Sequence, residues 1–114
     1  MKHVQLKKPT AQMSKSAFND VLRVCKVFGI DFIDLFKVEG YNWNEADART
    51  VIAYLLSTRY GLKDAHIGKI LNRHRTSIIE ANKRFMRYHE VDKPFREKCD
   101  LLKIEIQEKE TVTN

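Results

Sequence analysis

The fold of this chain is decided by the stretch Asn72-Arg73-His74-Arg75-Thr76-Ser77. It is a short polar turn between two segments, residues 63–71 and 75–89, whose apolar residues have the spacing of amphipathic helices. Two short helices joined by a tight turn are typical of a helix-turn-helix. The sequence therefore predicts a helix-turn-helix in the second half of the chain.

The positive charge of the chain is concentrated around this turn. Among the 114 residues, 21 are Lys or Arg and 15 are Asp or Glu, which gives a net charge of +6. Residues 59–87 hold eight of the basic and two of the acidic residues, so the rest of the chain carries equal numbers of each sign. A basic helix-turn-helix has the electrostatic and geometric outline of a DNA-binding element. The sequence pI of about 9.4 also favours nucleic acid over a membrane surface as the partner.

Apolar periodicity elsewhere predicts four more helices and no strand, so we expect an all-α single domain of six helices. The expected helices span residues 18–29, 31–37, 44–60, 63–71, 75–89 and 94–106. Asn44 is the expected N-cap of the third helix, and Pro94 suits the first turn of the sixth. We expect a flexible basic arm over residues 1–14, the helical domain over 15–108 and a flexible tail over 109–114.

Several residues that could indicate other chemistry are interpreted as structural. Cys25 and Cys99 lie on apolar helix stripes and are expected to be core residues rather than a disulfide. Trp43 and Tyr41 are expected to plug the core rather than to stack on a ligand. The four histidines lack metal-ligand spacing, so neither a metal nor another cofactor is expected. No apolar run approaches the ~20 residues of a membrane span, and the first residues lack a signal peptide, which favours the cytoplasm.

Four patches between residues 21 and 86 occur in the order that is typical of one known family. They are Val24-Cys25-Lys26-Val27-Phe28-Gly29-Ile30 with Asp34-Leu35, then Arg49-Thr50-Val51-Ile52-Ala53-Tyr54-Leu55, then Gly61-Leu62 with Ile67-Gly68, and finally Arg73-His74-Arg75-Thr76-Ser77-Ile78. Together they resemble the C-terminal DNA-binding domain of the bacterial chromosomal replication initiator DnaA. The resemblance implies a fold similar to that of the Trp repressor and double-stranded DNA as the partner.

The resemblance also implies which residues contact DNA. The family has an arginine and a polar residue that touch phosphate at the positions of Arg49 and Thr50, and its signature turn ends in two hydroxyl residues. With the basic residues around the turn, the expected DNA-binding residues are Arg49, Thr50, Lys63, Lys69, Arg73, His74, Arg75, Thr76, Ser77 and Arg84. Other replication or regulatory proteins are expected as further partners, and the bacterial nucleoid as the location.

The chain departs from the family at the positions that read DNA. Its turn is one residue shorter, with Asn72 where the family has two glycines, and the family's Asp-His pair is His74-Arg75. The loop over residues 38–43 lacks the basic residue that the family inserts into the minor groove, and Ser57 replaces a phosphate-binding lysine. We therefore expect the scaffold to be kept and the preferred DNA sequence to differ.

Some of these residues have a second interpretation within the protein itself. Arg49 could pair with Glu45, four residues earlier on the same helix, instead of with phosphate. His74 could cap or pack the turn instead of reading a base. Glu80 could form a capping box with Ser77, pair with Arg84 or accept from a cytosine amine. Lys63 and Lys69 could simply be solvated, as is expected of His66.

The function expected from the sequence is binding and not catalysis. The sequence contains no Gly-x-x-x-x-Gly-Lys-Ser/Thr loop, so the ATPase module of the initiator is missing and no nucleotide is expected as a partner. No arrangement of nucleophile and base predicts an enzyme. The leading expectation is a stand-alone, sequence-specific DNA-binding protein that acts in control of replication or transcription. The alternative is a protein-interaction module that keeps the helical fold with weakened DNA binding.

Overall fold

The computed structural model describes residues 13–37, 40 and 42–106, in which every regular element is helical. The elements in chain order are α2 (Lys15–Phe28), the 3-10 helix η2 (Phe32–Phe36), α3 (Trp43–Thr58), α4 (Asp64–Leu71), α5 (Arg75–Val91) and α6 (Lys93–Leu101). The all-α class is confirmed, but the described residues form five α-helices and not six. The arm and the tail predicted at the two ends lie outside the described residues, apart from Met13 and Ser14.

The predicted helix over residues 31–37 is the 3-10 helix η2. The backbone N–H of Asp34 donates to the carbonyl of Asp31 at 3.0 Å, and that of Lys37 donates to Asp34 at 3.4 Å. These are i→i+3 bonds, which suit a segment too short for a ladder of α-helical bonds. The Phe32 ring packs edge-on against Phe18 of α2, with 5.3 Å between the ring centroids. This contact holds η2 against the first helix.

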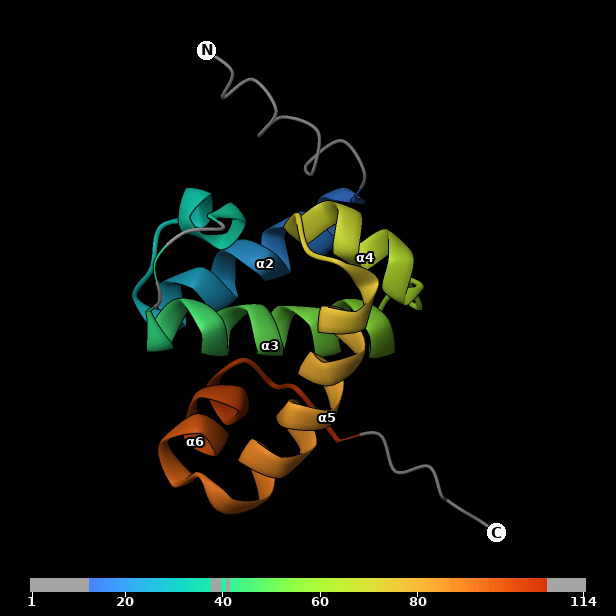
Figure 1. Cartoon of the computed structure of the whole chain (residues 1–114). Helices are drawn as coiled ribbons and strands as arrows, with labels where there is room; N and C mark the ends of the chain where they lie inside the picture. The colour runs from blue at the N-terminus through green and yellow to red at the C-terminus, as the bar shows by residue number, and fades with distance from the viewer. Residues whose placement is uncertain (1–12, 38–39, 41, 107–114) are drawn as a thin grey trace, which may run out of the picture.

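Helix α3 forms the centre of the molecule (Figure 1), with α2 and α4 on one side of it, α6 on the other and α5 crossing it. Because helices cover it from several directions, residues 51–56 are all buried. Its N-cap is Asn42 and not the predicted Asn44, since the Asn42 side chain accepts from the backbone N–H of Glu45 at 3.0 Å. Trp43 therefore opens the helix with 69% of its surface exposed, and the prediction that it plugs the core is wrong. Tyr41 lies outside the described residues.

Helices α4 and α5 are joined by a turn of three residues, Asn72, Arg73 and His74. Gly68 in α4 permits the turn to approach, since a Cβ atom at this position would lie 2.5 Å from the Arg73 carbonyl oxygen. Asn72 ends α4 in the left-handed conformation (φ 59°), which asparagine adopts more readily than most residues. The predicted two-helix unit is thus present, with the start of α5 held against α4.

The second half of α5 joins α3 and α6 through aromatic rings. Phe85 stacks on Tyr54 with 3.8 Å between centroids and meets Phe95 edge-on at 5.6 Å. The apolar periodicity of this helix also points Ile78, Phe85 and Met86 inward; Ile78 and Phe85 are buried, but Met86 is 41% exposed, so its inward position is wrong. The position one turn before Phe85 is filled instead by the buried Ala81. The crossing of α5 over α3 is therefore fixed by apolar contacts.

Helix α6 ends at Leu101, five residues before the last position predicted for its apolar stripe. Lys103 adopts a positive φ of 57°, which turns the chain so that Leu102 and Ile104 reach the core as irregular backbone. Arg59, at the end of α3, bonds the Lys103 carbonyl and the Asp20 carboxylate, each at 3.0 Å. The segment after α6 is therefore attached to the ends of α2 and α3.

Both cysteines are buried and unbonded, as the sequence predicts. Burial raises the pKa of Cys25 to about 11 and that of Cys99 to about 12, so both thiols stay protonated at neutral pH. Among the described helices, none combines the length and the apolar character that crossing a bilayer requires.

Candidate functional site

The exposed surface of the helix-turn-helix carries six of the ten predicted site residues. They are Lys63, Lys69, His74, Arg75, Thr76 and Ser77. Arg75, Thr76 and Ser77 form the first turn of α5, which contains no acidic residue to offset the positive end of the helix dipole. This first turn therefore presents a guanidinium and two hydroxyl groups together at the positive end of the helix.

His74 is the N-cap of α5, which is one of the two roles expected for it. Its Nδ1 atom accepts from the backbone N–H of Thr76 at 3.1 Å and lies 3.1 Å from the Thr76 hydroxyl. An accepting Nδ1 places the ring proton of the neutral imidazole on Nε2. His74 thus takes the capping position, and the capping box predicted between Ser77 and Glu80 does not form.

Arg73 is half-buried, and its guanidinium bonds backbone carbonyls within the protein. Nη1 donates to the carbonyls of Asn72 at 3.1 Å and Leu71 at 3.4 Å, and Nη2 donates to that of Lys37. Burial lowers the pKa of Arg73 below its ordinary value. A phosphate at Arg73 would have to share the guanidinium with these carbonyls.

The last three carbonyls at the end of η2 each accept a side-chain hydrogen bond from another element. Arg49 of α3 donates to Leu35 at 3.4 Å, Asn72 donates to Phe36 at 3.3 Å, and Arg73 donates to Lys37. Helix ends leave such carbonyls without intrahelical partners. These bonds connect η2 with α3 and with the turn. Sequence analysis did not find this role of Asn72, although its place at a left-handed helix end was a local signal.

Thr50 lies inside the protein and not on its surface. Its exposed fraction is 0%, its hydroxyl donates to the Ala46 carbonyl at 3.0 Å, and it accepts from Arg84 Nε at 3.2 Å and Nη2 at 3.1 Å. The predicted contact of Thr50 with phosphate is therefore wrong, because an external ligand cannot reach this hydroxyl. The hydroxyl instead holds Arg84 of α5 against α3.

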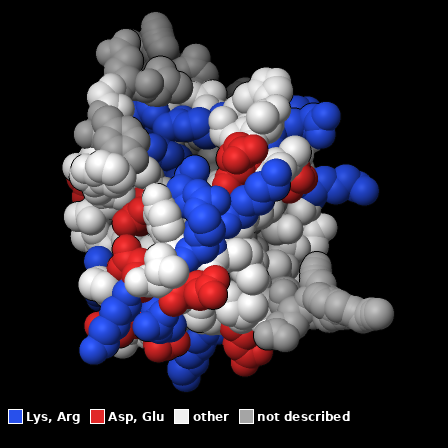
Figure 2. Space-filling model, turned by 60° about the horizontal axis from the view of Figure 1, so that its bottom comes forward, with Lys and Arg blue, Asp and Glu red and all other residues white. Residues whose placement is uncertain are grey.

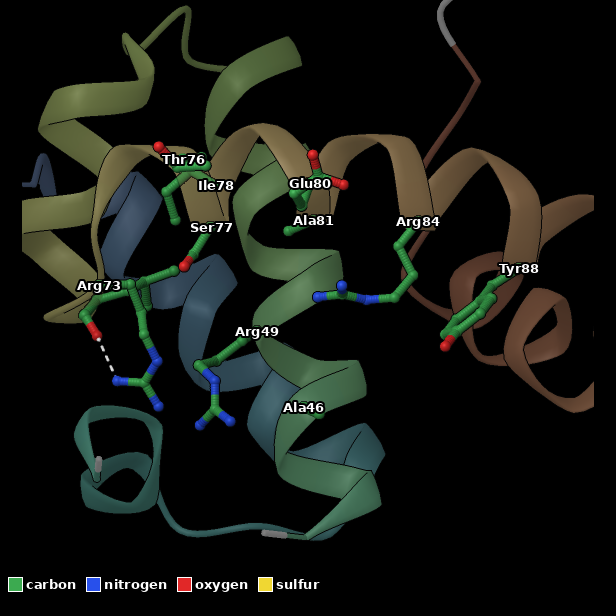
Figure 3. A pocket seen from close by; sticks show the side chains of 11 residues that line it. Ala46, Arg49, Arg73, Thr76, Ser77, Ile78, Glu80, Ala81, Arg84 and Tyr88 are labelled. Atoms are coloured by element: carbon green, nitrogen blue, oxygen red, sulfur yellow. Dashed lines mark hydrogen bonds between the residues drawn. The ribbon is translucent and has the colours of Figure 1, made fainter. Parts of the chain in front are cut away.

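A groove of about 470 Å³ lies between α3 and the part of α5 that extends as far as Tyr88. Figure 3 shows the side chains of Arg73, Arg49 and Arg84 in a row along it, with Ser77 facing it from α5. Thr76 also contributes to the lining, and Glu80 is its single acidic lining residue. The groove thus brings together three of the predicted arginines with the two hydroxyl residues of the first turn of α5, Thr76 and Ser77.

A second hollow of about 640 Å³ lies on the other side of the turn, between α4 and the start of α5. Lys69, Arg73, His74 and Arg75 line it, and none of its lining residues is acidic. Basic hollows therefore flank the first turn of α5 on both sides.

Two acidic residues near the groove, Glu45 and Glu80, differ in their burial. Glu45 is almost fully buried and bonds the Lys37 ammonium at 3.1 Å, which raises the pKa of Lys37. Glu80 is exposed, and within the described part of the chain it forms no ion pair with Arg84. The positive charge of Arg84 therefore remains without an ion-pair partner there.

Figure 2 shows the lower end of the molecule turned toward the viewer, with acidic side chains interspersed among basic ones. This agrees with the equal numbers of basic and acidic residues outside residues 59–87. The excess of positive charge thus belongs to the helix-turn-helix and not to the surface as a whole.

No known protein family matches the chain, and no curated protein or solved structure matches it either.

Proposed function

We propose that this chain is a sequence-specific double-stranded DNA-binding protein that reads a major groove with the first turn of α5. The observation that carries the proposal is the exposure of Arg75, Thr76 and Ser77 on that turn. Only three residues connect this turn to the end of α4. Arginine can bond guanine O6 and N7 together, and hydroxyl groups can bond bases or phosphates. The positive end of the α5 helix dipole, which lies at this turn, also favours phosphate.

The charge around α5 supports binding to a polyanion. Lys63 stands at the N-cap of α4 and Lys69 in its last turn, and both are exposed. Phosphates on the two strands that border a major groove would meet these lysines and the two basic hollows. Such contacts supply affinity without sequence preference, whereas the first turn of α5 supplies the preference.

The resemblance to the origin-binding domain of the replication initiator supports a role in control of replication or transcription. In this role the protein acts by occupying DNA in the bacterial cytoplasm, at the nucleoid, together with other replication or regulatory proteins. The proposed activity requires no nucleotide, cofactor or catalytic step.

A protein-interaction module is the second candidate, and two exposed apolar side chains favour it. Trp43 is 69% exposed and Ile33 is 52% exposed, and burial of either side chain against a partner would be favourable. If this candidate holds, Trp43→Ala should leave DNA affinity unchanged and abolish binding to a partner protein purified by its affinity for the wild type.

The test is selection of bound sequences from a random duplex pool, followed by binding measurements at ~50 and ~200 mM salt. We expect a defined sequence to be enriched, and log affinity to fall with log salt at a slope of roughly −3 to −5, as for about four neutralised phosphates. Lys93→Ala, which removes an exposed positive charge on α6, is the matched control and should leave the slope unchanged. Binding without any enriched sequence, or an affinity indifferent to salt, would refute the proposal.

A further inference from the structure

Thr50 and Arg84 form a contact that gives the buried threonine a role in recognition. We propose that Thr50 is a positioning residue, whose hydroxyl fixes Arg84 across the groove between α3 and α5 so that Arg84 binds one phosphate of the DNA backbone. The inference rests on the proposed DNA-binding function and assigns a task to a residue that DNA does not touch.

The Thr50 hydroxyl is fully used by groups of the protein. A hydroxyl has one proton to donate and two lone pairs to accept with. The proton goes to the Ala46 carbonyl at 3.0 Å, and Arg84 donates to the oxygen from Nε at 3.2 Å and from Nη2 at 3.1 Å. Because Thr50 is completely buried, water does not compete for these bonds. Arg84 is therefore held by two donors, which fixes the plane of its guanidinium.

The guanidinium keeps donors for a ligand. Arginine has five N–H groups, and Thr50 uses two of them, which leaves both groups of Nη1 and one of Nη2. Figure 3 shows the Arg84 guanidinium inside the groove, on the same side of α5 as Arg49. Burial raises the pKa of the nearby Asp47, and the positive charge of Arg84 opposes this rise only weakly. Within the described residues Asp47 and Arg84 form no ion pair. The site therefore holds a positive charge that is oriented and not neutralised by an ion pair.

The position of Arg84 along α5 favours phosphate over a base as its ligand. Arg84 follows Arg75 by nine residues, which at about 1.5 Å per residue places it ~13 Å further along the helix axis. When the first turn of a recognition helix contacts base edges, residues at that distance lie over the bordering backbone. A guanidinium held in one plane suits the paired oxygens of a phosphate.

The purely structural alternative is a bond that only joins α3 to α5. The stacked rings of Tyr54 and Phe85 already join these helices one turn away, at 3.8 Å between centroids. If the Thr50 bond were only such a link, its loss would change stability and leave the salt dependence of DNA binding intact. The two roles therefore differ in a measurable way.

The experiment compares Thr50→Val, Thr50→Ser, Arg84→Ala and the double variant Thr50→Val/Arg84→Ala in the full chain. Valine keeps the shape of threonine without the hydroxyl, and serine keeps the hydroxyl. Thr58→Val is the matched control, because the Thr58 hydroxyl donates to the carbonyl four residues before it at 2.9 Å, as Thr50 does. Unlike the hydroxyl of Thr50, that of Thr58 accepts no arginine bond in the described structure.

We expect Arg84→Ala to lower affinity for a random-sequence duplex about tenfold and to make the salt slope shallower by about one. Thr50→Val should also lower this affinity and make the salt slope shallower, whereas Thr50→Ser should keep the wild-type affinity. Thr58→Val should change neither the affinity nor the slope. In the Arg84→Ala background, Thr50→Val should have no further effect. Additive losses in the double variant, or an unchanged slope in Thr50→Val, would overturn the positioning role.

A measurement without DNA separates this inference from the proposed function. In the free protein, the NMR signal of the Arg84 Nε–H should show slow solvent exchange in wild type and Thr50→Ser, and fast exchange in Thr50→Val. Equal exchange in all three proteins would overturn the contact itself. A protected signal in a wild-type protein that does not bind duplex DNA would instead overturn the proposed function, and with it the phosphate at Arg84.

Discussion

Replacing Gly68 with alanine perturbs the turn that places α5. The added Cβ atom would lie 2.5 Å from the Arg73 carbonyl oxygen, whereas ordinary contact begins at 3.4 Å, so the turn must move by about 0.9 Å. The obstructing atom is backbone and cannot rotate away as a side chain does. Overpacking of this kind costs about 1–3 kcal/mol, while glycine to alanine in a helix interior gains about 1 kcal/mol. We therefore expect Gly68→Ala to lower the free energy of unfolding by up to about 2 kcal/mol.

Thermal unfolding measures this loss, which corresponds to a decrease in Tm of up to about 10 °C for a domain of this size. Ala65→Gly is the control, because Ala65 is exposed on the same helix and its replacement changes helix propensity alone, by about 1 kcal/mol. DNA affinity should fall in Gly68→Ala, because the displaced turn carries the start of α5, and should be retained in Ala65→Gly. A Gly68→Ala protein that melts above the wild type would refute the close approach of the turn.

Three further predictions concern ligands. Lys69→Ala should weaken binding to all duplexes about equally and make the salt slope shallower by about one, and an unchanged slope would remove Lys69 from the phosphate contacts. Arg75→Ala should cost about 1–3 kcal/mol on the selected site and relax the preference at one or two adjacent base pairs. Identical selected sequences with uniformly weaker binding would make Arg75 a backbone contact. Calorimetry should detect no ATP binding, because the sequence lacks a phosphate-cradling loop, and stoichiometric binding would contradict this.

Apolar periodicity predicted the helices well, and it failed where two local signals competed. The sequence Asn42-Trp43-Asn44 offers two possible caps, and only the side chain of Asn42 reaches the N–H of the third residue after it. Moving the helix start by two residues turns Trp43 outward. The size and apolarity of tryptophan predicted burial, but the register of α3 decided its exposure.

The exposed part of the site could be predicted because residue type and position on the turn are local features. The roles of Thr50 and Arg73 could not. Thr50 bonds an arginine 34 residues later, and Arg73 bonds a carbonyl 36 residues earlier. Such contacts depend on how α3, η2 and α5 pack, which no local pattern of residues specifies. An arginine or threonine in a basic segment therefore predicts a ligand contact even where the folded chain supplies the partner.

Arg73 and Arg75 differ in how many of their hydrogen-bond donors remain unused by the protein. Arg73 is half-buried and shares its guanidinium among three carbonyls, whereas Arg75 is exposed as the first residue of α5. His74 uses Nδ1 to cap the helix, so under the proposed function we expect base preference to fall mainly to Arg75 and the hydroxyl groups after it. In the initiator family suggested by the sequence patches, an acid and an imidazole occupy the corresponding positions. An acid accepts from a cytosine amine, whereas arginine donates to guanine, so the sense of the hydrogen bond is reversed. We therefore expect the selected site to contain a guanine opposite Arg75, and the usual initiator box to be bound poorly.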